Sequence, residues 1–206
     1  MNLTFYYASG ANCCDRVRWA LDYKRIPYQL ADMDGEFDQA HFAAISPFGR
    51  VPILEIDGMP LSESMAMLEW LEETFPQRPL GGASALARAK VREMCEAVNA
   101  SIHPVQNSSV VAYFLPGYSK QQMRPLRARW IGSNLQKLES RLWQTSGFAC
   151  NEQFTLADIF IALIYRKGVT LGLLPQQYPR YEAHWQFLLG IDDIRASCPL
   201  LPATPA

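Results

Sequence analysis

The sequence predicts two consecutive domains, a compact α/β domain over residues 1–80 and an all-helical domain over residues 81–206. The first observation behind this prediction is the alternation of short apolar runs with helical patterns up to residue 80. The second is a cluster of prolines and glycines at 76–82, after which no convincing strand pattern appears. A chain of 206 residues with 49% hydrophobic content can bury a core in each part.

The first half is expected to run strand, helix, strand, helix, hairpin, helix. The run from Leu3 to Tyr7 is apolar and aromatic, as in a buried strand, and the helix after the turn at 8–12 ends before Pro27. Asp57-Gly58 is a strong signal for a two-residue hairpin turn. The remaining expected elements are strands at 26–30, 51–56 and 59–61, a short helix at 41–45, and a helix that opens at Ser62 or Glu63.

The second half is expected to be helical at 85–114, 120–146, 156–173 and 178–189. Thr155 stands where a helix N-cap belongs, and Asp158 follows three residues later, so its carboxylate can bond back to the N–H of the cap. Phe154 and Ile159 are spaced to form a hydrophobic staple around this capping box. We interpret this motif as structural rather than chemical.

Composition excludes several classes of function. The formal net charge is −1 and no long run of Lys or Arg is present, so neither a nucleic acid nor an anionic membrane surface is an expected partner. The N-terminal residues lack the basic and apolar regions of a signal peptide, and no window reaches the length of a membrane span. We therefore expect a cytoplasmic protein.

The five cysteines do not form a pattern typical of a disulfide framework or a structural zinc site. They are odd in number, include no CxxC pair and lack metal-type spacing to the three histidines, so no metal is expected. Cys95, Cys150 and Cys198 are interpreted as buried or half-buried side chains. Cys13 and Cys14 lie where the first helix begins and require a separate argument.

Two sequence blocks carry a resemblance to a known family. Residues 11–21, ANCCDRVRWAL, resemble the Ser-Ser-Cys-x-x-Arg-Val-Arg-x-Ala-Leu signature of zeta-class glutathione transferases and of maleylacetoacetate or maleylpyruvate isomerases. Residues 46–54, SPFGRVPIL, and 61–74, LSESMAMLEWLEET, resemble the family's Val-Pro strand and its Glu/Gln-Ser helix start. The segment at 103–107 is similar to the zeta-type His-Pro-x-x-Asn segment.

This resemblance implies a thioredoxin-like first domain, an all-helical second domain, a homodimer and bound glutathione. It implies a cis peptide between Val51 and Pro52, with the Val51 backbone pairing with the cysteinyl unit of glutathione. Ser64, at a helix start, would hold the γ-glutamyl carboxylate, and Glu63 would accept from the ligand's ammonium. Without the resemblance, Glu63 and Ser64 are an ordinary acidic helix start.

The glutathione thiol must lose its proton to react, so the site needs a group that stabilises a thiolate. The family's Ser-Ser-Cys is replaced here by Ala11-Asn12-Cys13, which removes the usual hydroxyl. Ser9 or the Asn12 amide are the candidates to replace it. Cys13 matches the family's cysteine; it is either a reactive thiol that exchanges with glutathione or a residue packed at the turn.

The helical domain supplies further candidates. Gln106 is a candidate glutathione ligand, and His103 is a weaker one that would face the substrate. The zeta enzymes bind their diacid with an arginine whose position, counted from the capping box, corresponds to Thr170 here. Arg166, one turn earlier, is either its substitute or a solvated helical cation.

These observations predict a glutathione-dependent transferase acting on small electrophiles, with isomerisation of a maleylacetoacetate-like substrate as the first specific hypothesis. Two other classes stay open. One is a thiol-disulfide exchange enzyme that uses Cys13, which Cys13→Ser would inactivate. The other is a non-catalytic module of the same fold that binds a protein partner.

Overall fold

The computed structural model describes residues 1–35 and 37–202, which divide into two compact units. The first unit comprises Met1–Pro79 and the segment that begins at Asp192, and the second comprises Leu80–Ile191. The sequence predicts this last segment to be part of the helical domain. It contacts the first unit instead, through the buried side chain of Ile194 and ion pairs from Asp193 to Arg25 and Arg78.

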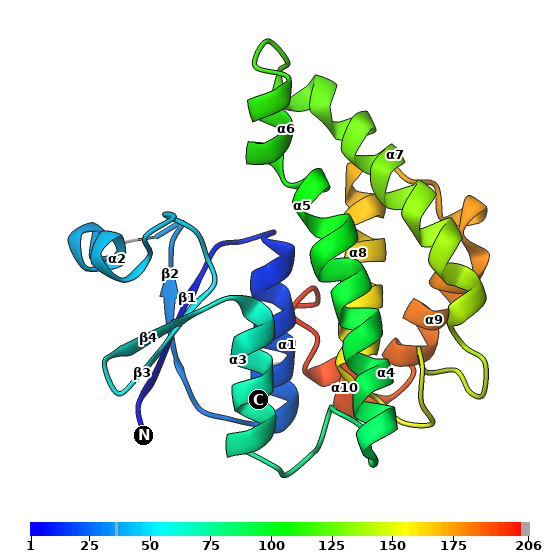
Figure 1. Cartoon of the computed structure of the whole chain (residues 1–206), viewed down its shortest axis with the longest axis horizontal. Helices are drawn as coiled ribbons and strands as arrows, with labels where there is room; N and C mark the ends of the chain where they lie inside the picture. Colours follow the sequence, from blue (N-terminus) through cyan, green and yellow to red (C-terminus); the bar gives the residue numbers. More distant parts are fainter. Residues whose placement is uncertain (36, 203–206) are drawn as a thin grey trace. The chain divides into compact units, whose positions relative to one another are not determined.

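The first unit is built on a mixed four-stranded sheet with the strand order β2-β1-β3-β4 (Figure 1). β1 is parallel to β2 and antiparallel to β3, and β4 is antiparallel to β3. This is the thioredoxin-like arrangement that the resemblance implies, and the predicted fold class is confirmed. The elements are β1 (Leu3–Tyr7), α1 (Asn12–Lys24), β2 (Gln29–Asp32), α2 (Gln39–Ile45), β3 (Ile53–Ile56), β4 (Met59–Ser62), α3 (Ser64–Thr74) and α10 (Asp192–Ala196).

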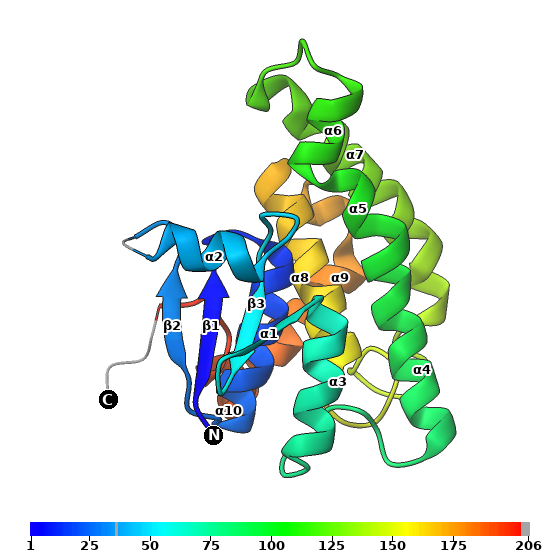
Figure 2. The same ribbon diagram turned by 60° about the vertical axis from the view of Figure 1, so that its left-hand side comes forward.

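Helices cover both faces of this sheet. Because side chains alternate along a strand, Tyr6 and Ile53 point to one face, where they form a buried cluster with Phe42 of α2. Phe5 and Leu54 point to the other face and are completely buried. Figures 1 and 2 show α2 on the first of these faces and α1 with α3 on the second.

The strand expected at 26–30 lies at Gln29–Asp32. The reason is the end of α1, where Arg25 adopts a left-handed conformation (φ 58°) and the Ile26 N–H donates to the Leu21 carbonyl at 3.0 Å. Ile26 therefore completes the helix C-cap, and the strand begins only after Pro27, with Gln29 paired to Thr4 of β1.

Lys24 connects the ends of α1 and α3. Its side chain is 1% exposed, and its Nζ lies 2.7 Å from a carboxylate oxygen of Glu72. The same ammonium donates to the Phe75 carbonyl at 2.8 Å and more weakly to the carbonyls of Gln77 and Arg78. One buried charge thus satisfies the carbonyl of the residue that caps α3 and two carbonyls of the loop that follows it.

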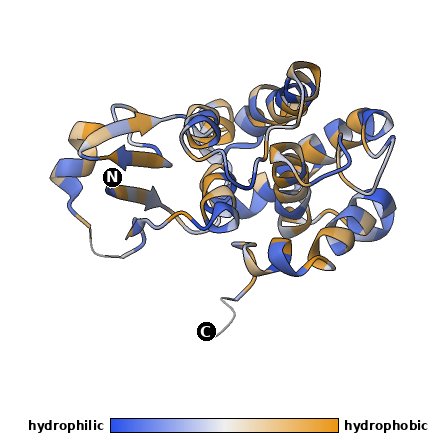
Figure 3. Cartoon of the chain, turned by 90° about the horizontal axis from the view of Figure 1, so that it is seen from below, coloured by the Kyte–Doolittle hydropathy of each residue, from blue (hydrophilic) through white to orange (hydrophobic). Residues whose placement is uncertain are grey.

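The second unit is built of helices. In Figure 3 most helix ribbons carry both hydrophobic and hydrophilic residues. No helix among the described residues combines the length and the apolar character needed to cross a bilayer. The elements are α4 (Ala85–Glu96), the π-helical turn η1 (Ala97–Ile102), α5 (His103–Gln106), α6 (Ser108–Phe114), α7 (Lys120–Leu138), the 3₁₀ turn η2 (Glu139–Arg141), α8 (Leu156–Leu171), the 3₁₀ turn η3 (Pro175–Gln177) and α9 (Pro179–Leu189).

The single helix expected at 85–114 is interrupted twice. Pro104 has no N–H to donate within the helix, and the turn before it widens so that the His103 N–H bonds to the Val98 carbonyl. Asn107 then leaves the helical conformation (ψ 131°) and caps α6, with its side-chain oxygen accepting from the Ser109 N–H at 3.1 Å. The predicted start and end of the helical region are otherwise close to those observed.

The helix expected to reach residue 146 also ends early, at Leu138. Trp143 has a positive φ of 56°, which an α-helix does not allow, and its N–H bonds to the Ala149 carbonyl at 3.0 Å. The residues after η2 therefore form a loop that folds back on itself before α8 begins.

The predicted capping box at Thr155 and Asp158 is confirmed. The Asp158 carboxylate is fully buried and accepts from the Thr155 N–H at 2.8 Å and the Thr155 hydroxyl at 3.0 Å. Its other oxygen accepts from the Ala149 N–H at 2.6 Å and lies 3.0 Å from Nε2 of His184 on α9. One carboxylate therefore joins the start of α8, the preceding loop and α9.

Replacing Asp158 with alanine is expected to lower the free energy of unfolding by about 3–5 kcal/mol, because it leaves buried donors without an acceptor. Urea unfolding followed by circular dichroism measures the change. Asp192→Ala removes an exposed carboxylate and is the matched control, with an expected change within about 0.5 kcal/mol. Equal effects of the two substitutions would contradict the role assigned to Asp158.

Replacing Lys24 with methionine should cost about 3 kcal/mol in the same measurement, because Glu72 and the carbonyls at the end of α3 lose a buried cation. Lys90→Met removes an exposed ammonium that pairs with Glu93 and should change stability by no more than about 0.5 kcal/mol. A Lys24→Met protein as stable as Lys90→Met would show that the buried contacts of Lys24 do not contribute.

Candidate functional site

Four of the predicted site residues lie at one end of the β3–β4 hairpin. Val51 and Pro52 directly precede β3, and Glu63 and Ser64 directly follow β4. Ile53 pairs with Ser62 across the two strands, so these flanking residues lie at the same edge of the sheet. The Val51–Pro52 peptide is cis, as the resemblance implies.

Cys13 brings the start of α1 to this edge. Its half-buried thiol donates a hydrogen bond to the Val51 carbonyl, with Sγ 3.4 Å from the oxygen, although the two residues are 38 positions apart in the chain. A hydrogen bond donated by the thiol stabilises its neutral form relative to the thiolate. No side chain caps the helix at Ala11, and the N-terminus of a helix is a favourable position for an anion.

Asn12 is held by a residue one turn further along α1. The Nη2 group of the fully buried Arg16 donates to the amide oxygen of Asn12 at 2.9 Å. This bond orients the Asn12 amide, because its oxygen must face Arg16. The amide nitrogen of Asn12 makes no hydrogen bond to another described residue, so its N–H groups are the available donors.

Ser9 lies in the exposed loop before α1. Its backbone N–H donates to a carboxylate oxygen of Asp34 at 2.9 Å, which fixes the loop against the turn after β2. The described hydrogen bonds of Ser9 therefore involve its backbone and not its hydroxyl. Of the two predicted thiolate-stabilising groups, Asn12 is the more firmly oriented.

Glu63 and Ser64 begin α3 in an unusual backbone conformation. Glu63 has φ 68°, an uncommon value for a residue with a side chain, and such strain is concentrated at functional sites. Ser64 is the first residue of α3 and is 5% exposed. Its hydroxyl makes no hydrogen bond within the described part of the chain, so a ligand is free to use it.

Gln106 is engaged by its own unit. Its buried side-chain oxygen accepts from Arg127 of α7 at 3.2 Å, and its Nε2 lies 3.1 Å from Nδ1 of His103. Arg127 also donates to the Gln106 carbonyl. These contacts connect α5 to α7, and the expected contacts of Gln106 and His103 with ligands stay predictions.

Arg166 points to α9. One of its guanidinium nitrogens lies 3.9 Å from Glu182, and the group stacks at 5.2 Å over the Trp185 ring. Glu182 in turn accepts from the Tyr165 hydroxyl at 2.7 Å. Burial raises the pKa of this carboxyl, but hydrogen bonds from Tyr165 and Gln186, together with the charge of Arg166, bring it below its usual value. The role of Arg166 as a substrate cation stays a prediction, and its described partners give it a structural one.

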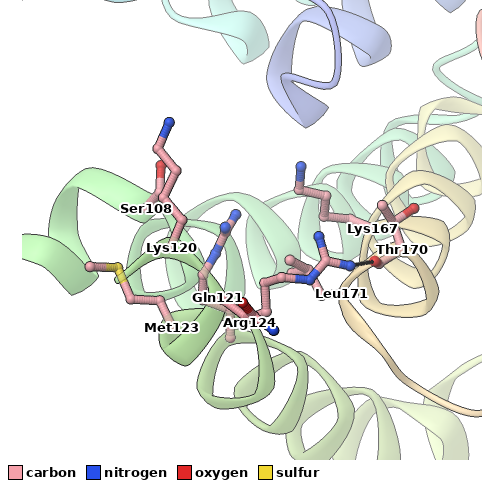
Figure 4. A pocket seen from close by; sticks show the side chains of 9 residues that line it. Ser108, Lys120, Gln121, Met123, Arg124, Lys167, Thr170 and Leu171 are labelled. Atoms are coloured by element: carbon pink, nitrogen blue, oxygen red, sulfur yellow. Dashed lines mark hydrogen bonds between the residues drawn. The ribbon is translucent and has the colours of Figure 1, made fainter. Parts of the chain in front are cut away.

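A group of basic residues on α7 and α8 is not among the site residues that the sequence predicts. Lys120, Arg124 and Arg127 recur at intervals of four and three residues, a spacing that places them on one helix face. With Lys167 of α8 they line a pocket of about 570 Å³ (Figure 4). The spacing of these cations is visible in the sequence and could have indicated a binding site. The same spacing is equally typical of the solvent-exposed face of a helix. The other lining residues are Ser108, Gln121, Met123, Thr170 and Leu171.

The five cysteines form no disulfide bond in the described structure. A hydrogen bond with the Cys13 side chain, together with burial, raises the pKa of the Cys14 thiol well above its usual value. Burial, with a smaller effect from the nearby Asp158 carboxylate, raises the pKa of Cys150 to about 12. Within the described residues, no cluster of three or more His, Cys, Asp or Glu side chains is placed to hold a metal ion.

Comparison with known proteins extends this description. Residues 5–79 match the glutathione S-transferase N-terminal domain family. The maleylacetoacetate isomerase of Pseudomonas aeruginosa is 32% identical over 185 residues, which cover 87% of each chain. The chain belongs to the glutathione S-transferase family. The predicted resemblance is thereby confirmed, as is the expectation of a glutathione-dependent enzyme at the level of the family.

Two solved structures are similar to this transferase over 98% of its length. A maleylpyruvate isomerase, described as a bacterial glutathione S-transferase of the zeta class, superposes with a TM-score of 0.85 at 25% identity, covering 98% of this chain and 100% of that one. A maleylacetoacetate isomerase from Methylobacterium extorquens, solved with malonate and glutathione bound, gives a TM-score of 0.83 at 28% identity with the same coverage.

The thiols of this transferase should differ sharply in reactivity. Because a thiol with a pKa of about 12 stays protonated at pH 8, Cys150 should react slowly with iodoacetamide at that pH and faster as the pH rises. Cys14 should be protected in the same way, so Cys13 should be alkylated before either of them. Peptide mass spectrometry over time measures the order. Fast alkylation of Cys150 at pH 8 would contradict the assigned environment.

Proposed function

We propose that this transferase uses glutathione to isomerise the cis double bond of a small maleylacetoacetate-like electrophile. The observation that carries the proposal is the convergence of Cys13, Val51 and the start of α3 at one sheet edge. The names of the relatives, maleylacetoacetate isomerase and maleylpyruvate isomerase, support the reaction type. Addition of glutathione to other small electrophiles would use the same groups.

The residues at this edge fit glutathione. The Ser64 hydroxyl has no partner among the described residues and stands at the start of an 11-residue helix, so it can donate to the γ-glutamyl carboxylate. Glu63 is adjacent and exposed, where its carboxylate can accept from an ammonium. The backbone of Val51 can pair with the cysteinyl unit in the manner of an added strand, and its carbonyl has a second lone pair beside the bond from Cys13.

Bound glutathione would supply a thiolate that adds to the conjugated double bond and leaves again after rotation about the resulting single bond. The role of this chain is to keep that sulfur ionised. The Asn12 amide, oriented by Arg16, would donate N–H groups, and the uncapped start of α1 adds a partial positive charge. Ser9 is the alternative donor.

The proposed assembly follows the same resemblance. Residues 1–80 would act as the glutathione-binding domain and 81–206 as the helical domain, with the segment from Asp192 packed on the first unit. Gln106 would add a glutathione contact, and His103 and Arg166 would face the substrate. We propose a homodimer located in the cytoplasm.

Titration calorimetry with reduced glutathione tests the proposal. The wild-type protein should bind in the micromolar to millimolar range, and Ser64→Ala should weaken binding about tenfold or more, because a charge-assisted hydrogen bond is lost. Ser62→Ala, an exposed serine two residues earlier, should bind as the wild type does. No glutathione binding by the folded protein would contradict the proposal and favour an interaction module.

A second candidate, thiol-disulfide exchange, is favoured by one observation, the position of Cys13 beside Val51. In this reaction the Cys13 thiolate would attack a glutathionyl disulfide and release the other thiolate, and a second glutathione would then displace Cys13. Cys13→Ser separates the candidates, since it should abolish exchange and leave glutathione-dependent isomerisation intact. Loss of isomerisation in a folded Cys13→Ser protein would contradict the first candidate as described.

A further inference from the structure

The charges of the chain are unevenly distributed. Residues 97–138, which extend from η1 to the end of α7, contain five Lys and Arg residues and no Asp or Glu. The rest of the chain contains 14 Lys and Arg residues and 20 Asp and Glu residues, so the formal net charge of −1 averages over two regions of opposite sign. An anionic partner would be attracted to the first region and repelled by the second. The five cations are Lys120, Arg124, Arg127, Arg129 and Lys137.

α6 adds exposed aromatic side chains to the basic region. None of its seven residues is buried, and Tyr113 and Phe114 are 80% and 72% exposed. Their rings pack edge to face, with centroids 5.2 Å apart, so they form one aromatic projection. Tyr118, in the loop after α6, is exposed as well. A group of exposed large apolar side chains marks an interaction site, whereas a single one does not.

The aromatic and basic residues meet at one end of the second unit. Figures 1 and 2 both show α6, and the loop that joins it to α7, beyond the end of α8. Lys120 is the first residue of α7 and Arg124 follows about one turn later, and both residues are exposed. We call residues 113–124 the α6–α7 tip. Because the tip projects from the unit, it can touch a flat surface, whereas a bound peptide needs a groove or a sheet edge.

A lipid surface with anionic headgroups fits these properties. Aromatic side chains insert at the level of lipid headgroups, and Lys and Arg residues beside them are attracted to anionic lipids. No Asp or Glu is among the described residues that line the pocket beside Lys120 and Arg124. The attraction of these two cations to an anionic surface is therefore not opposed by a carboxylate of that pocket.

We propose that the α6–α7 tip is a peripheral binding surface for membranes that contain anionic phospholipids. Tyr113 and Phe114 insert between the headgroups, and Lys120 and Arg124 lie against the lipid phosphates. The acidic rest of the chain is repelled by the same surface, which favours an orientation with the tip toward the membrane. The inference is independent of the proposed isomerase function, since it uses none of the residues assigned to glutathione.

Co-sedimentation of the whole chain with lipid vesicles tests the proposal. At low ionic strength the protein should bind vesicles of equal parts phosphatidylserine and phosphatidylcholine about tenfold or more tightly than vesicles of phosphatidylcholine alone. The double variant Tyr113→Ser/Phe114→Ser and the single variant Lys120→Glu should each weaken this binding about tenfold or more. Added salt should reduce the effect of Lys120→Glu, because mobile ions screen charges, and should leave the effect of the aromatic double variant largely unchanged.

Two matched variants on α4 control for the loss of an exposed side chain in general. Leu86 is 71% exposed and Arg88 is also exposed, and both lie outside the tip, so Leu86→Ser and Arg88→Glu should bind vesicles as the wild type does. Equal losses in the control and tip variants would overturn the assignment to the tip, and an aromatic double variant that binds as the wild type does would overturn the insertion of Tyr113 and Phe114. Absent binding to the mixed vesicles, or equal binding to phosphatidylcholine alone, would overturn the lipid surface. Binding of poly-glutamate in place of vesicles would overturn it in favour of an acidic protein partner.

Discussion

The helical unit depends on the buried carboxylate of Asp158. It is the acceptor for the cap of α8, for the loop that enters α8 and for the imidazole of α9. Between its cap and its last turn, α8 is buried along most of its length, so the other helices pack around it (Figure 1). The direction of α8 determines where Lys167 and Thr170 lie. It therefore also places the Thr170 carbonyl, which accepts a hydrogen bond from Arg124 of α7. The charge distribution of the pocket thus follows from a capping interaction located about three turns away along the same helix.

In the first unit the equivalent constraint is the pairing of β3 with β4. The two-residue turn at Asp57-Gly58, with positive φ at both residues, fixes the register in which Ile53 faces Ser62. That register brings Val51 and Pro52, which precede β3, to the same edge as Glu63 and Ser64, which follow β4. None of these four residues is part of a strand. The strained backbone of Glu63 lies at this junction, and Cys13 reaches it from α1. The candidate site is therefore a product of strand register rather than of any single motif.

Features that depend on neighbouring residues could be predicted from the sequence. The hairpin, the capping box and the change from α/β to helical pattern all follow from local rules, and they were confirmed. Features that depend on distant partners could not. The shift of β2 follows from the way α1 ends. The break at Asn107 arises because this residue caps α6 and does not continue α5. The family motif identified Gln106 as a candidate, but the sequence does not reveal that Arg127 and His103 already occupy its amide. The cationic face of α7 was visible as a spacing, and only the packing of α8 beside it shows that this face lines a pocket.

The return of the last segment to the first unit makes that unit discontinuous. Its polypeptide enters the helical unit after Pro79 and comes back at Asp192, where Ile194 is buried and Asp193 pairs with two arginines of the first unit. In terms of connectivity the helical unit is an insertion. A fragment that stops at residue 80 would lack the segment from Asp192, and the hydrophobic side chains that pack against Ile194 would become exposed. A deletion variant that joins the two pieces of the first unit directly would keep them buried.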